Sequence, residues 1–171
     1  LNFAHGDIIM VGAYSVIVSA VTLKLPPVVA ILIAVVVCAA LGVTIEFLAY
    51  RPLRQSPPLA VLITAIGVSY LLQNLALLIF GPEQKSTPAL FDLPSLTLGG
   101  VTVDGITLLT LGVTAAIMVG LTLFINLTRM GKAMRAVSED RDAAELMGIS
   151  VNKTITITFA IGSALAAVAS V

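Results

Sequence analysis

Long runs of apolar residues alternate with short polar connections along this 171-residue chain. A helix needs about 20 apolar residues, or roughly 17 at the least, to cross the hydrocarbon core of a bilayer. Lipid offers backbone groups no water to bond, so such stretches are predicted to be helical. Five stretches are candidates, the first of them short: 4–23, 27–49, 59–80, 107–127 and 154–171. The pattern predicts an all-α fold, a polytopic transmembrane helix bundle that forms a single domain over residues 1–171.

The composition is that of a membrane protein, because 58% of the residues are hydrophobic and 11% are charged, against roughly 25% charged in soluble domains. The formal net charge is zero, so bulk charge points to no nucleic-acid partner. Cys38 is the only cysteine, which excludes an internal disulfide and a Cys-based zinc site. The chain opens at Leu1 and stops at Val171 within an apolar run, so we expect further sequence at both ends.

Lysine and arginine in the connections predict the orientation, because basic loops face the cytoplasm. Two connections, after the second and the fourth stretch, carry most of the basic residues: Arg51 and Arg54, then Arg129, Lys132, Arg135, Arg141 and Lys153. The alternate connections carry only Lys24 and Lys85. The loop over 128–153 is therefore predicted to be cytoplasmic and the loop over 81–105 extracytoplasmic.

The extracytoplasmic loop contains two short alternating segments. Leu96-Thr97-Leu98 and Val101-Thr102-Val103 flank a Gly-Gly pair. Alternation of apolar and polar residues about such a pair is typical of a tight β-hairpin. We expect a hairpin packed on the bundle as a lid, with docking of an extracytoplasmic partner as the alternative.

One acidic residue interrupts the second apolar stretch. Small side chains let helix backbones approach closely, and a row of them recurs at every fourth position: Ala30, Ala34, Cys38 and Gly42. Glu46 continues this row, so it is predicted to face protein rather than lipid. The alternatives are an ion pair with Arg51 or Arg54 near the interface, and a role as a gating or pathway carboxylate, because ionisable groups inside membranes are often functional.

Two amides lie in the third stretch. Gln73 and Asn74 sit about two-thirds of the way along it, where an amide requires a partner helix. The alternatives are hydrogen bonds between helices and direct contact with a transported substrate.

A polar cluster stands near the start of the chain. Asn2, His5 and Asp7 surround Gly6, and one histidine with one nearby carboxylate offers too few ligands for a catalytic zinc site, so no metal is predicted. The alternatives are a helix start, with Asp7 or Asn2 capping free N–H groups, and a helix break that lines a cavity. In the second case these residues would belong to the pathway.

The polar loop over 128–153 is predicted to contain a short helix. Gly131 is expected to break the chain after the fourth span, and Ser138 to cap a new helix in which Arg141 stands where a capping-box Glu would be. Gly148 is placed to end that helix with a left-handed residue. From Lys132 to Met147 the apolar positions fall close to helical spacing, with charged residues elsewhere: Ala133, Met134, Val137, Ala144 and Met147. We expect a helix from Glu139 to Met147, with a solvated connector as the alternative.

Several motifs resemble one family. Asp142-Ala143-Ala144 followed by Gly148 is similar to the Glu-Ala-Ala-x-x-x-Gly coupling motif of ABC importer permeases, with Asp for Glu. The segments LNFAHGD at 1–7, FLAYRPLRQSPPL at 47–59 and LITAIGVSYLLQN at 62–74 resemble the branched-chain amino acid permease family. The resemblance covers essentially the whole chain, although the Ile-x-Leu-Pro tail of the general motif is absent after Gly148.

The resemblance implies an integral permease subunit in the cell inner membrane, which is not an enzyme and needs no cofactor. The implied partners are a second permease subunit, two cytoplasmic ABC ATPases that hydrolyse ATP, an extracytoplasmic solute-binding protein that delivers leucine, isoleucine or valine, and membrane lipid. The chain itself lacks a GxxxxGK[ST] phosphate loop.

The family motif also implies roles for the residues of the loop helix. Ala143, Ala144 and Gly148 would give the close fit to the ATPases. The charged side chains would steer and orient the docking: Glu139, Arg141 and Asp142.

An ion-gradient-driven secondary transporter or a channel is the alternative from another functional class. Glu46, Asp7 and the pair of Gln73 and Asn74 support it, because proton or sodium coupling requires polar groups within the membrane. The two hypotheses differ in whether ATPase subunits accompany the protein.

Overall fold

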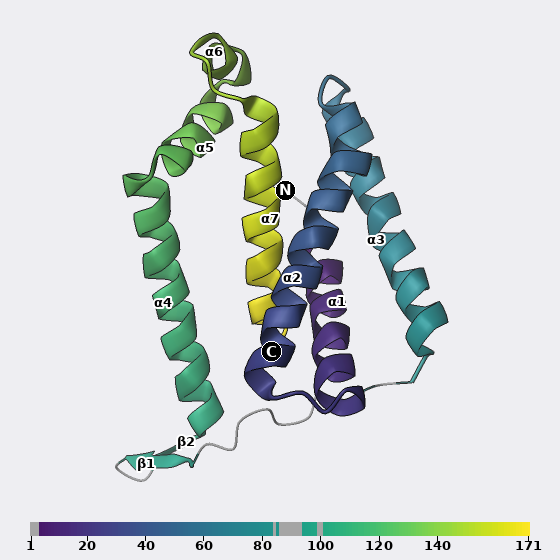
Figure 1. Cartoon of the computed structure of the whole chain (residues 1–171), viewed down its shortest axis with the longest axis vertical. Coiled ribbons are helices and arrows are strands. Elements are labelled where there is room, and N and C mark those ends of the chain that lie inside the picture. Colours follow the sequence, from purple (N-terminus) through teal and green to yellow (C-terminus); the bar gives the residue numbers. More distant parts are fainter. Residues whose placement is uncertain (1–3, 84, 86–93, 99–100) are drawn as a thin grey trace. The chain divides into compact units, whose positions relative to one another are not determined.

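The computed structural model describes residues 4–83, 85, 94–98 and 101–171. Contacts divide the chain into two compact units, Leu1–Pro88 with Ile155–Val171, and Ala89–Thr154. Figure 1 labels the helices and strands along the chain.

Helices make up most of both units. They are α1 (His5–Ile17), α2 (Pro27–Ile45), α3 (Pro58–Phe80), α4 (Gly105–Leu127), α5 (Arg129–Glu139), α6 (Arg141–Leu146) and α7 (Val151–Ala169). A π-helical turn extends α1 over Val18–Thr22, and another extends α2 over Glu46–Tyr50 before a 3-10 turn at Arg51–Leu53.

Five helical segments are long and apolar enough to cross a membrane: His5–Thr22, Pro27–Leu53, Pro58–Phe80, Gly105–Leu127 and Val151–Ala169. The prediction of an all-α, polytopic helix bundle is confirmed. The organisation of residues 1–171 as one permease domain stays a prediction.

Proline and glycine set the boundaries of two spans. Pro27 and Pro58 occupy the first positions of α2 and α3, where the missing N–H has no intrahelical partner to lose and φ is already helical. Gly81 ends α3 at φ 79°, and its N–H donates to the Leu77 carbonyl at 2.9 Å. Glycine enters this region without the steric penalty of a Cβ.

The core of the first unit joins α1, α2 and α7 through small side chains. The predicted row on α2 is buried throughout, at Ala30, Ala34, Cys38 and Gly42. The thiol of Cys38 donates to the Ile8 carbonyl of α1 at 3.5 Å. A Cβ placed on Gly12 would lie 2.6 Å from Ser170 Oγ, so the glycine lets α1 approach the chain just beyond α7 at a distance that alanine would prevent.

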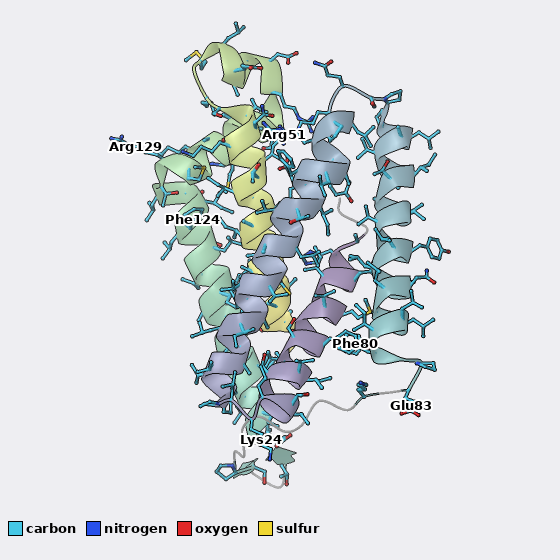
Figure 2. The ribbon with its side chains drawn as sticks, turned by 45° about the vertical axis from the view of Figure 1, so that its right-hand side comes forward. Lys24, Arg51, Phe80, Glu83, Phe124 and Arg129 are labelled. Carbon is cyan, nitrogen blue, oxygen red and sulfur yellow. The ribbon has the colours of Figure 1, made fainter. Side chains whose placement is uncertain are left out.

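An aromatic pair joins α1 to α3. The rings of Tyr14 and Phe80 are stacked, with centroids 4.0 Å apart and planes 4° from parallel. Figure 2 shows Phe80 at the last turn of α3, beside α1. Stacked rings add to the apolar burial of the contact, so this pair holds the end of α3 on α1.

The second unit contains the predicted β-hairpin. Strand β1 (Leu96–Leu98) pairs antiparallel with β2 (Val101–Val103), and Leu98 stands opposite Val101. The hairpin prediction is confirmed, while the connecting glycines, 99 and 100, and its predicted role as a lid lie outside what the described residues test.

The break after α4 falls earlier than predicted. Thr128, with extended backbone, separates α4 from α5, and its hydroxyl oxygen accepts the Gly131 N–H at 3.0 Å as an N-cap. Gly131 itself lies inside α5, where a Cβ would overlap the backbone of Ile125. The expectation of a break at Gly131 is wrong because this glycine permits close approach of two helix ends, while the threonine caps.

Gly42 gives the sharpest test of this packing. A Cβ on Gly42 would overlap the Ser163 side chain and lie 2.6 Å from its Cβ. Gly42→Ala is therefore expected to destabilise the protein by about 1–3 kcal/mol through overpacking, measured as the free energy of unfolding in detergent. Gly67→Ala is the matched control, since its Cβ would meet no atom within 4 Å. Adding Ser163→Gly to Gly42→Ala should restore most of the loss, and equal stability of the two single variants would contradict the close contact.

Candidate functional site

The loop helix α6 begins at an aspartate cap. Asp140 has extended backbone, and its Oδ1 accepts the N–H groups of Asp142 at 2.9 Å and Ala143 at 3.0 Å. The predicted start is therefore wrong: Ser138 donates its hydroxyl to the Arg135 carbonyl at 2.7 Å within α5, and Glu139 ends α5. A serine inside a helix often bonds back to its own turn, which leaves the cap to the next suitable side chain.

The other end of α6 is closed by glycine, as predicted. Gly148 has φ 80°, its N–H donates to the Glu145 carbonyl at 2.9 Å, and the Ile149 N–H donates to the Ala144 carbonyl at 3.0 Å. These two bonds form the Schellman motif, in which a left-handed residue satisfies the last carbonyls of a helix. With both ends capped, α6 is a short element of fixed shape.

Two apolar side chains project from the end of this helix. Leu146 is 90% exposed and Met147 is 82% exposed, whereas Ala144 is 4% exposed. Met147 falls at the helical spacing of the buried Ala144, yet its side chain is exposed because it follows α6 at the glycine turn. Leu146 was not a candidate at all. The sequence did contain a signal for this exposed surface, because Leu146 and Met147 stand directly before the capping glycine in an otherwise polar loop.

The remaining candidates of the loop lie on its surface. Four predicted docking residues are exposed: Glu139, Arg141, Asp142 and Ala143. Their side chains are accessible to a partner, and their docking roles stay predictions.

Glu46 is fully buried and joins α2 to α7. Its Oε1 pairs with the Arg54 guanidinium, and its Oε2 accepts the Thr156 hydroxyl at 2.8 Å. Arg51, the other candidate partner, lies instead over the Phe47 ring at 5.2 Å; Figure 2 labels it at the end of α2. The prediction that Glu46 faces protein and pairs with a loop arginine is confirmed, and a gating role stays a prediction.

A second polar contact joins α1 to α3. Gln73 Nε2 donates to Asp7 Oδ1 at 2.9 Å, and Asp7 is 8% exposed. The interhelical bond expected of Gln73 is confirmed. The interhelical bond expected of Asn74 is wrong, because this exposed side chain donates to the Tyr70 carbonyl of its own helix at 2.7 Å.

For the polar cluster near the beginning of the chain, the structure shows a helix start rather than a helix break. The helix begins at His5 without a side-chain cap and runs through Gly6, so within the described residues there is a helix start and no break at Gly6. Asp7 does not cap it, since its carboxylate is engaged by Gln73. His5 is exposed, and Asn2 lies outside the described residues.

A cleft of about 570 Å³ opens between α1 and α3. Apolar side chains of both helices line it together with Gln73, and the segment just after α3 adds two charged residues: Glu83 and Lys85. Among the described residues, no three His, Cys, Asp or Glu side chains gather as a metal site would need. The described polar features of the first unit thus include the contacts of Glu46 with Arg54 and Thr156, the hydrogen bond between Gln73 and Asp7, and the cleft that Gln73 lines.

Comparison with known proteins identifies the family. The family model described as "Branched-chain amino acid transport system / permease component" matches residues 1–171. The chain belongs to this permease family. Together with the five candidate spans, this makes it a multi-pass membrane protein.

Curated relatives agree with this assignment. The chain is 39% identical to the high-affinity branched-chain amino acid transport system permease protein BraD of Pseudomonas aeruginosa, with 100% of the chain and 60% of that protein covered. It is 37% identical to the corresponding protein LivH of Escherichia coli K12, with 100% and 59% covered. A probable branched-chain amino acid transport permease protein LivH of Methanocaldococcus jannaschii is 29% identical, with 98% and 55% covered.

The match is therefore to part of each relative. The chain spans about three fifths of the length of the two bacterial proteins. No solved structure matches the chain.

The buried ion pair between Glu46 and Arg54 leads to a prediction about protein stability. Removing one partner of a buried ion pair leaves the other charge uncompensated, so Arg54→Ala is expected to destabilise the full-length protein by about 3 kcal/mol, measured by unfolding in detergent. The double variant Glu46→Leu with Arg54→Leu should recover at least half of that loss. Arg51→Ala, which removes an exposed arginine of the same loop, should change the stability by less than about 0.5 kcal/mol. Equal effects of Arg51→Ala and Arg54→Ala would contradict the assignment of the pair.

Proposed function

We propose that this chain forms much of the permease subunit of a binding-protein-dependent ABC importer, which provides the path for branched-chain or related amino acids across the inner membrane. The family match over residues 1–171 supports this proposal. The observation that carries it is the exposed apolar end of α6, where Leu146 and Met147 are 90% and 82% exposed in a helix capped at both ends. Exposed apolar side chains rimmed by charges mark a surface for a protein partner.

The partners follow from this role. Two cytoplasmic ABC ATPases receive α6, a second permease subunit completes the pore, and an extracytoplasmic binding protein delivers the solute. The orientation that puts Arg51, Arg54 and α6 in the cytoplasm follows the positive-inside rule. Lipid surrounds the spans.

Docking at α6 uses apolar burial for affinity and charge for approach. Leu146 and Met147 enter a groove on the ATPase, where burying each side chain contributes about 1.5–3 kcal/mol. Glu139, Arg141 and Asp142 orient the encounter, since charges at an interface rim act mainly on association rate and register. Ala143 adds an exposed, small surface that permits close approach.

A displacement of α6 by the ATPases is then transmitted to the membrane-spanning helices α7 and α2. Four residues, Met147 to Ser150, connect α6 to α7. Along α7, Thr156 donates to Glu46 and Ser163 fills the space above Gly42. Closure of the ATPases on ATP pushes α6, and α7 carries α2 with it because the two helices share a buried hydrogen bond and a tight small-residue contact.

The exposed apolar pair yields the first functional prediction. The double variant Leu146→Ser with Met147→Ser is expected to reduce the amount of ATPase that co-purifies with the full-length complex at least tenfold, because losing a few kcal/mol of apolar burial weakens the contact by that factor or more. Glu145→Ser is the matched control, because it removes an exposed side chain of α6 directly before the pair without removing apolar surface. Normal ATPase recovery with the double variant would contradict docking through these side chains.

The glycine that ends α6, Gly148, leads to a second functional prediction. Gly148→Asp is expected to abolish ATP-driven uptake while membrane insertion stays normal, because it adds a side chain and a charge at a left-handed position on the docking surface. Gly148→Asn is the control, since asparagine tolerates positive φ and brings no charge; it should retain more uptake than Gly148→Asp. Wild-type uptake and a full complement of ATPases in Gly148→Asp would argue against the docking role.

A further inference from the structure

A row of positive charges runs along α5, directly after the span α4. Arg129, Lys132 and Arg135 are spaced three residues apart, and all three side chains are exposed. In an α-helix these positions fall within an arc of about 120° and along a rise of about 9 Å. We call these three residues the basic stripe. Figure 2 shows the Arg129 side chain extending away from the ribbon where α4 meets α5.

No acidic side chain of the described residues pairs with the basic stripe. The ion pair found there joins Glu46 to Arg54. The chain has no Asp or Glu over residues 105–138. Glu139 lies four residues beyond Arg135 and is exposed, but it forms no ion pair with it. The stripe therefore presents three positive charges to its surroundings.

The opposite face of α5 is fixed against the end of α4. Gly131 is buried, and a Cβ placed on it would overlap the backbone of Ile125. The hydroxyl oxygen of Thr128 accepts the Gly131 N–H at 3.0 Å, which fixes the start of α5. Because α4 is long and apolar enough to span a membrane, this contact keeps the basic stripe at the level where the hydrocarbon core gives way to the lipid headgroups.

One cation of the stripe is tied back to the span. Arg135 Nη1 donates to Asn126 Oδ1, in the last turn of α4, at 3.2 Å. A guanidinium has five N–H donors, so this bond orients the group and leaves donors for an anion. The amide of Asn126 is neutral, and the positive charge of Arg135 stays uncompensated.

Apolar side chains beside the basic stripe are exposed as well. On the last turns of α4, Leu123 is 51% exposed and Leu127 is 72% exposed. An apolar surface that ends in a cluster of cations matches a phospholipid, whose acyl chains lead to an anionic phosphate. An acidic soluble protein would match the cations alone, because Leu123 and Leu127 belong to a candidate membrane span.

We propose that the basic stripe binds the phosphate of an anionic phospholipid in the leaflet where α4 ends. Arg129 and Lys132 attract the headgroup, and Arg135, oriented by Asn126, adds a charge-assisted hydrogen bond. The acyl chains lie along the exposed end of α4. Each Lys or Arg close to an anionic membrane surface strengthens binding about fivefold. This lipid selectivity is separate from the importer role and from the identity of the solute.

The test is local lipid selectivity in a bilayer. A fluorescent amino acid replaces Leu127 in the full-length permease, which is placed with its co-purifying subunits in phosphatidylcholine vesicles. Quenching is measured with traces of phosphatidylglycerol or phosphatidylcholine that carry the same nitroxide on one acyl chain. We expect phosphatidylglycerol to quench at least about fivefold more effectively at equal mole fraction. Equal quenching by the two lipids would overturn the proposal.

Matched variants separate charge recognition from folding. The double variant Arg129→Gln with Lys132→Gln should lose the preference for phosphatidylglycerol, whereas Lys132→Arg, which keeps the charge, should retain it. Lys153→Gln removes an exposed lysine outside the stripe and should leave the preference unchanged. Asn126→Ala releases Arg135 but keeps its charge, so it should weaken the preference less than the double variant does. An unchanged preference in the double variant would contradict recognition by the stripe.

Soluble anions and proteins are the alternative occupants. Inorganic phosphate should weaken the preference no more than sodium chloride of equal ionic strength, because both only screen the charges; a specific effect of phosphate would overturn the proposal in favour of a free anion. Loss of co-purifying ATPase in the double variant, with unchanged quenching, would assign the basic stripe to a protein contact. If no ATPase accompanies the wild type while the lipid preference persists, the importer role fails and the lipid site stands.

Discussion

A lipid bilayer supplies no hydrogen-bond partner to a polar side chain, and the first unit of this chain is organised by the way its few intramembrane polar groups meet that constraint. Glu46 is satisfied by Arg54 and Thr156, which ties α2 to α7. Asp7 is satisfied in part by Gln73, which ties α1 to α3. Because apolar contacts between helices gain little over contacts with lipid, these bonds and the small-residue contacts hold the helices of the first unit together.

The two polar contacts differ in how completely charge is balanced. Glu46 has a full positive partner and a hydroxyl donor, so it behaves as a structural link between helices. Among the described residues, Asp7 is supported by the neutral amide of Gln73 and by the partial charge of the helix start, and Gln73 lines a cleft. The contrast separates Glu46, whose charge is balanced by Arg54, from Asp7, whose described side-chain partner is neutral.

Sequence reasoning predicted features that depend on local chemistry. The spans follow from hydropathy, the hairpin from alternation, and the Gly148 cap from the steric freedom of glycine. It failed where neighbouring residues compete for one role. Arg51 and Arg54 are equivalent in the sequence, and the 3-10 turn at Arg51–Leu53 brings the second to Glu46. Ser138 and Asp140 are both good caps, and backbone geometry selects Asp140. The outward direction of Met147, which follows α6, depends on the turn at Gly148, and no periodicity rule describes that turn.

The central claim is that the tip of α6 is the surface on which an ATPase acts. The most direct measurement is photo-crosslinking in intact cells, with a benzophenone amino acid at position 146 of the full-length permease and the crosslinked product identified by mass spectrometry. The account predicts a crosslink to a polypeptide that carries a nucleotide-binding phosphate loop, with a yield that changes when ATP is depleted. Crosslinks only to lipid or to the permease itself would contradict it.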